Sequence, residues 1–81
     1  EQPANLSKNQ RQQIERNINK TETKISELEK KLRQLSFQIS EPEIIADHLK
    51  LRKVSENVEQ TERQIQNLYT EWENLVGKLN G

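Results

Sequence analysis

Two runs of aliphatic residues repeat at alternating steps of four and three, and this spacing restricts the possible folds more than any other feature. The first run covers residues 14–39 and the second covers residues 51–79. A mean period of 3.5 residues is typical of helices whose apolar stripe packs against another helix. The main residues of this stripe, called the seam below, are Ile18, Ile25, Leu28, Leu32, Leu35, Val58, Ile65, Leu68, Trp72 and Leu75.

The two runs are separated by the segment Ser40-Glu41-Pro42-Glu43. Because proline interrupts a continuous helix, this break favours an antiparallel coiled-coil hairpin over one long helix that pairs with a second chain. We therefore predict an all-α, two-helix hairpin with a short proline-containing helical turn at its tip, and we expect the isolated domain to be a monomer. The predicted parts are a linker at 1–7 and a hairpin at 8–79, with helices at about 8–39 and 48–78 and a tip at about 40–47.

Polar residues at the expected helix starts predict how the helices are capped. Ser7 is placed to accept hydrogen bonds from the free amides of the first turn. Ser40 and Glu43 match a capping box, with Pro42 early in the following turn. Asp47 offers a further start, because its carboxylate can cap the next turn.

Apolar residues also surround the expected tip. Ile44, Ile45 and Leu49 precede the regular heptads of the second run. We expect them to fold over Phe37 and to form an apolar plug there.

Two helix registers are compatible with the heptads. One places the small Thr21 opposite the large Trp72, and the other places Ile14 opposite Trp72. We prefer the first, because it pairs a small side chain with a large one.

Composition excludes several classes of protein. Only 30% of the chain is hydrophobic and 32% is charged, which suits a thin helical seam and not a thick globular core. There is no cysteine, hence no disulfide framework and no thiolate zinc site. No apolar stretch approaches the length of a membrane span, and the start of the sequence lacks the pattern of a signal peptide. The expected location is cytoplasmic, without membrane contact.

The sequence shows little that would indicate a catalytic, metal or cofactor site. His48 has no nucleophile placed beside it, and we interpret it as an exposed polar residue near the tip. Asp47 and Glu43 are the only nearby carboxylates that could join it at a metal, and zinc sites use better-spaced donors. The glycines are Gly77 and Gly81, so no glycine-rich phosphate loop exists. We predict no catalytic residue, metal or cofactor in this domain.

Basic residues recur on the first helix, on the side predicted to face away from the seam. Residues 1–40 carry a net charge of about +3 and residues 41–81 about −3. A basic row can neutralise phosphates, although several glutamates interrupt this one, and an ordinary solvated surface is the alternative. The candidate nucleic-acid-binding residues are Arg11, Arg16, Lys20, Lys30 and Arg33.

Trp72 lies on the seam, where packing between the helices is its first interpretation. Docking against a neighbouring domain near the base of the hairpin is the second.

Several segments resemble the C-terminal domain of ABC-F ATPases of the Uup type. These segments are Leu6-Ser7-Lys8, Ile25-Ser26-Glu27-Leu28-Glu29, Glu41-Pro42-Glu43 and Leu68-Tyr69-Thr70-Glu71-Trp72-Glu73-Asn74-Leu75. The sequence differs from the family at Lys8 and at Ile44-Ile45, where the family often has aromatic residues.

The resemblance implies a domain that follows two nucleotide-binding cassettes of the same chain. ATP and Mg²⁺ would belong to those upstream ABC domains, and this domain would not be an enzyme. In Uup-like members the hairpin is associated with DNA binding, and the wider family acts on ribosomes, so the implied partners are DNA or ribosomal RNA. The alternative function is a purely structural or protein-docking arm without nucleic-acid contact.

Overall fold

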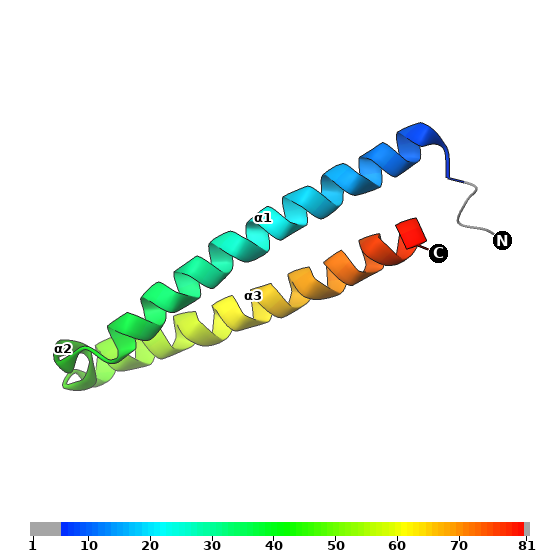
Figure 1. Cartoon of the computed structure of the whole chain (residues 1–81). Helices are drawn as coiled ribbons and strands as arrows, with labels where there is room; N and C mark the ends of the chain where they lie inside the picture. Colours follow the sequence, from blue (N-terminus) through cyan, green and yellow to red (C-terminus); the bar gives the residue numbers. More distant parts are fainter. Residues whose placement is uncertain (1–5, 81) are drawn as a thin grey trace.

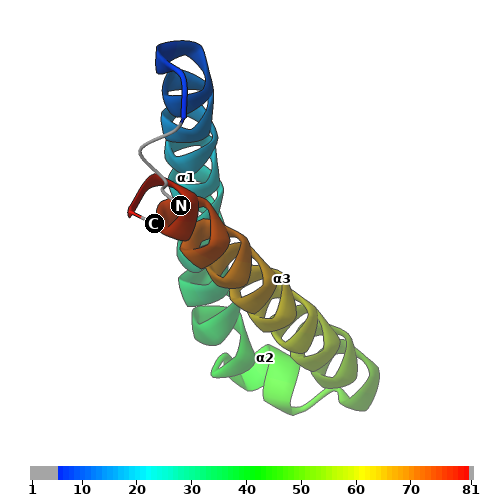
Figure 2. The same cartoon turned by 90° about the vertical axis from the view of Figure 1, so that its right-hand side faces the viewer.

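The protein is a long, thin helical hairpin. The structure is a computed structural model that describes residues 6–80. It contains α1 (Lys8–Ile39), α2 (Pro42–Ile45) and α3 (His48–Asn80), and it measures 58 × 17 × 13 Å. The long helices α1 and α3 lie side by side in opposite directions, and the single turn α2 connects them at the tip (Figure 1). A view from the side shows α3 crossing α1 at an angle (Figure 2). The predicted all-α hairpin is therefore confirmed.

A capping box begins α1. The Ser7 hydroxyl accepts from the Gln10 amide at 3.1 Å, and the Gln10 side-chain oxygen accepts from the Ser7 amide at 2.9 Å. The two bonds satisfy polar groups that the first helical turn leaves without backbone partners. Ser7 was predicted as a cap, whereas its partner Gln10 was not. Of the linker predicted at 1–7, residues 1–5 lie outside the described part of the chain.

The capping box predicted at Ser40 is wrong. Ser40 ends α1 with helical backbone angles, and its hydroxyl donates to the Phe37 carbonyl at 2.8 Å. An N-cap residue needs extended backbone, and here Glu41 provides it, without a side-chain capping bond. Pro42 follows in the first turn of α2, where its missing N–H needs no partner.

Asp47 caps the start of α3, as its position in the sequence predicts. Its Oδ1 accepts from the amides of Leu49 at 3.0 Å and of Lys50 at 3.2 Å. From there α3 continues to Asn80, past the expected end near residue 78, and Leu79 still packs half-buried on the seam side.

The core is a single thin layer between α1 and α3. Ile25, Leu35 and Ile65 are its buried aliphatic residues, and Thr21 and Thr61 are buried beside them. The other seam residues are half-buried, because a pair of helices covers each side chain from one direction only. They are Ile18, Leu28, Leu32, Val58, Leu68, Trp72 and Leu75.

The register follows from one contact across the seam. The indole nitrogen of Trp72 donates to Glu22 Oε2 at 2.9 Å, and Glu22 adjoins Thr21. Ile14 lies about 12 Å from Glu22 along α1, at the 1.5 Å rise of a helix. Trp72 is therefore level with Thr21, and the alternative register is excluded.

The apolar plug expected at the tip does not form. Phe37 is 75% exposed, Leu49 is 77% exposed and Ile45 is 56% exposed. Phe37 lies midway between the seam residues Leu35 and Ile39, so its heptad position points it away from the partner helix. Of the predicted plug only Ile44 is even half-buried.

Candidate nucleic-acid interface

The basic residues predicted from the sequence form an exposed but dispersed set on α1. Arg16, Lys20, Lys30 and Arg33 occupy heptad positions on the side of the helix away from α3. Arg11 differs from them, because its heptad position is on the seam side. In the observed register its level lies beyond Asn80, where α3 has no described residue to cover it, and Arg11 is exposed. The structure thus places all five residues in solvent but does not gather them into a pocket.

One of the two broad faces of the hairpin carries aromatic side chains that are hydrogen-bonded to carboxylates. The Tyr69 hydroxyl donates to Glu29 Oε2 at 3.0 Å, and the Trp72 indole donates to Glu22 Oε2 at 2.9 Å. Both bonds join α3 to α1 over the groove between the helices, where they flank a shallow cavity of about 260 Å³. Trp72 is half-buried there, so its aromatic ring serves the packing between the helices and its polar atom is already bonded.

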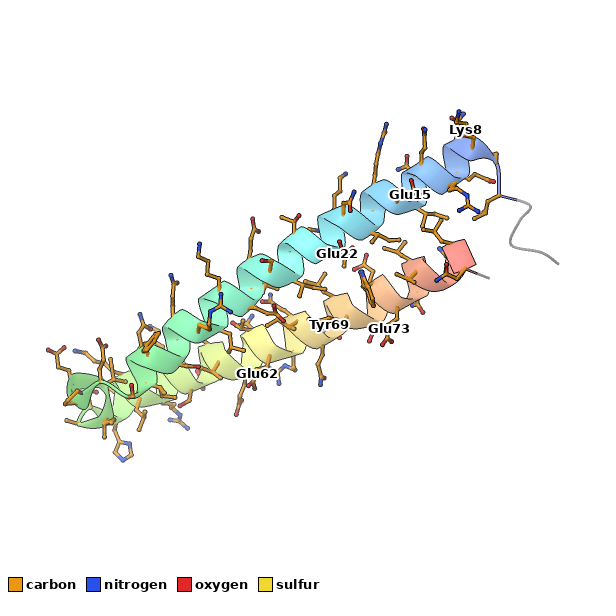
Figure 3. All side chains as sticks on the ribbon, viewed as in Figure 1. Lys8, Glu15, Glu22, Glu62, Tyr69 and Glu73 are labelled. Atoms are coloured by element: carbon orange, nitrogen blue, oxygen red, sulfur yellow. The ribbon has the colours of Figure 1, made fainter. Side chains whose placement is uncertain are left out.

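Glutamates recur along most of that face. Figure 3 shows Glu15 and Glu22 on α1 and Glu62 and Glu73 on α3, spread over the length of the hairpin. Glu59 and Glu62 border another shallow groove on the same side. Arg33 and Arg52 also have heptad positions on this side, near the tip. We call this surface the acidic face; its carboxylates are Glu15, Glu22, Glu29, Glu59, Glu62 and Glu73.

The opposite broad face is rich in lysine. Lys24 and Lys31 from α1 border a groove of about 550 Å³ together with Gln64 and Asn67 from α3, and Leu28 and Leu68 line it as well. Lysines at the equivalent heptad positions continue this surface towards both ends of the hairpin. Glu27 and Glu71 are the acidic residues of the long helices that interrupt it. We call it the lysine face, and its cations are Lys20, Lys24, Lys31, Lys50, Lys53 and Lys78.

Of the candidate residues expected from the sequence, only Lys20 belongs to the lysine face. Lys24, Lys31 and the lysines of α3 were not among those candidates. The missing signal lies in the heptads. The heptad positions on one side of the seam are rich in glutamate in both helices, and those on the other side are rich in lysine in both.

The hydrogen bond at Tyr69 leads to a prediction for titration. The bond to Glu29, followed by the negative charge of that carboxylate, raises the pKa of Tyr69 above its ordinary value. The folded state thus favours the protonated phenol. Its contribution to stability is complete below the pKa of an unfolded tyrosine, about 10, and is lost as pH rises through the higher folded pKa.

Tyr69 is the only tyrosine, so an ultraviolet absorbance titration observes it alone. We expect a higher midpoint in the native protein than in denaturant, and Glu29→Gln should move the native midpoint back towards the ordinary value. Identical native and denatured midpoints would show that the bond is absent in solution.

No catalytic or metal-binding arrangement is evident in the described residues. His48 is exposed, and the Asp47 carboxylate near it already caps α3. Within residues 6–80, no three His, Cys, Asp or Glu side chains gather in a way that could hold a metal ion. Across the same residues, no helix combines the length and apolar character needed to cross a membrane.

Comparison with known proteins gives one match. The model of the family described as "ABC transporter C-terminal domain" matches residues 5–76. No curated protein and no solved structure matches the chain. The match spans the whole of α1, the whole tip and nearly all of α3, and it agrees with the resemblance drawn from the sequence.

Proposed function

The chain belongs to the ABC transporter C-terminal domain family, and on that premise we propose that this hairpin is a non-catalytic nucleic-acid-binding appendage of an ABC-F type ATPase. DNA or ribosomal RNA would be its partner. ATP and Mg²⁺ would bind the nucleotide-binding cassettes upstream in the same chain, and the protein would act in the cytoplasm.

The observation that supports nucleic-acid binding is the surplus of exposed cations on particular surfaces of a protein with no net charge. The formal net charge is zero at pH 7. An even mixture of charges would give phosphates no preferred surface. Here exposed lysines and arginines follow the outer side of α1 and the lysine face, so that parts of the hairpin attract polyanions.

Apart from its surface charges, the hairpin has few features that could bind a ligand. Its aliphatic residues are used in packing α1 against α3, and the grooves between the helices are shallow. An enclosed pocket of the kind that binds a small molecule is absent from the described residues. A partner large enough to contact many surface charges at once suits this geometry better than a small ligand.

Titration of a labelled DNA duplex with the isolated hairpin tests the proposal. Fluorescence anisotropy should show saturable binding at about 50 mM salt, and the affinity should fall steeply towards 200 mM salt as released counterions oppose the complex. No binding at the lower salt concentration would contradict the proposal for duplex DNA. If ribosomal RNA also failed to bind, the result would favour the structural or protein-docking arm.

A further inference from the structure

We infer that the lysine face is the surface along which duplex nucleic acid lies, in preference to the outer side of α1. This inference rests on the proposed function and assigns its contact surface. It adds Lys24, Lys31, Lys50, Lys53 and Lys78 to the candidate residues and retains only Lys20 of those expected from the sequence.

The first reason is the extent of the lysine face. Its cations come from both helices, whereas the set expected from the sequence comes from α1 alone. Lys50 and Lys78 are about 42 Å apart along α3 at the 1.5 Å rise of a helix, with lysines of α1 at levels between them. That length corresponds to about one turn of duplex DNA, so several phosphates can be contacted at once.

The second reason is the groove that runs along this face. Lys24 and Lys31 border it on α1, and the side-chain amides of Gln64 and Asn67 border it on α3. Glu27 is the one carboxylate among its lining residues, so donors outnumber it. Amides and ammonium groups both donate hydrogen bonds to phosphate oxygens. The groove thus presents donors from both helices to one sugar–phosphate backbone.

The opposite side of the molecule disfavours the same ligand. A duplex placed on the acidic face would meet carboxylates from both helices, including Glu15 of α1 and Glu62 and Glu73 of α3. Like charges at short range repel, most strongly at low salt. The two faces together therefore fix which side of the hairpin turns towards the nucleic acid.

The distribution of aromatic side chains favours duplex over single strands. Tyr69 and Trp72 border a groove of the acidic face and hydrogen-bond carboxylates there, and Phe37 lies in another groove with Arg33 and Ser36. None of the three lines the groove of the lysine face. Single-strand binding proteins stack unpaired bases on aromatic rings, which this face lacks. Contacts here would reach phosphates and would be independent of sequence.

A matched pair of double variants tests the inference. Lys31→Glu with Lys53→Glu reverses one cation of each helix on the lysine face. Lys30→Glu with Arg63→Glu makes the same change in net charge at exposed positions on the outer sides of α1 and α3. Both are titrated with a labelled 24-base-pair duplex at about 50 mM salt, after circular dichroism has established that each retains its helices. If a reversed pair unfolds, Lys31→Gln with Lys53→Gln is compared with Lys30→Gln and Arg63→Gln.

We expect the lysine-face variant to lose about tenfold or more in affinity and the outer variant to lose about threefold or less. Single-stranded DNA of the same length should bind the wild-type hairpin more weakly than the duplex. Equal losses in the two variants, or a larger loss in the outer one, would overturn the assignment while leaving nucleic-acid binding intact. Failure of the wild-type hairpin to bind any nucleic acid would overturn the proposed function itself, so the two failures are distinguishable.

Discussion

Replacing Ile65 with alanine is expected to lower the free energy of unfolding of the hairpin by about 2 to 4 kcal/mol. Ile65 is 8% exposed and belongs to the thin layer in which, among the described residues, only Ile25 and Leu35 are also buried aliphatic side chains. The substitution removes apolar contact area and leaves a gap that two helices can close only in part. Urea denaturation followed by circular dichroism measures the change.

The same substitution at the tip provides the control. Ile45 is 56% exposed and lies in α2, outside the seam. Ile45→Ala should change the free energy of unfolding by less than about 1 kcal/mol. If both variants were equally destabilised, the core would not lie where the structure places it.

Thr21→Leu is expected to destabilise the hairpin by about 1 to 3 kcal/mol, because the site has no room for a larger side chain. Thr21 is 5% exposed, and the ring of Trp72 lies at its level on α3. A leucine there would displace the indole and break its bond to Glu22. Trp72 is the only tryptophan, so its fluorescence should report a more exposed ring together with the lower melting temperature.

Thr23→Leu is a close control for this prediction. Thr23 is exposed, and its hydroxyl donates to the Asn19 carbonyl at 3.0 Å, as that of Thr21 does to the Asn17 carbonyl at 2.8 Å. Both variants therefore lose the same kind of bond, and they differ in whether the new side chain meets α3. An unchanged melting temperature and emission for Thr21→Leu would contradict the register.

The fold was predictable because several independent sequence features agree. The heptads give two long helices with one apolar stripe each, and Pro42 separates them. The helix register was also predictable from the sequence, because the small Thr21 is a good match for the large Trp72 across the seam. Ser7 and Asp47 were identifiable as caps because each lies just before an expected helix start and has a side chain that accepts amide hydrogen bonds.

The tip was less predictable, since its geometry depends on where the first helix ends. The side chains of Ser40 and Glu43 match a capping box, but Ser40 still has helical backbone angles and is the C-cap of α1. Phe37 and Leu49 are large and apolar, yet their heptad positions direct them outward, and each is more than 70% exposed. Hydrophobicity alone therefore overestimated burial where the helix phase opposes it.

The candidate interface was predictable in chemistry but not in position. Assessing each helix alone suggests a basic α1 beside a neutral α3, because the acidic surplus of residues 41–81 comes from Glu41, Glu43 and Asp47 at the tip. Packing the helices in the observed register shows a second division, in which residues such as Lys31 of α1 and Lys53 of α3 share one broad face while Glu22 and Glu73 share the other. That division depends on both helices at once, so the charge of either helix does not reveal it.

An NMR titration of the isotope-labelled hairpin with duplex DNA tests the central claim most directly, because it observes both faces in one experiment. We predict that the amide signals that shift will cluster on the lysine face, around Lys24, Lys31, Gln64 and Asn67, while those of Glu62 and Glu73 stay in place. Shifts concentrated on the acidic face or on the outer side of α1, or no shifts at all, would contradict the account.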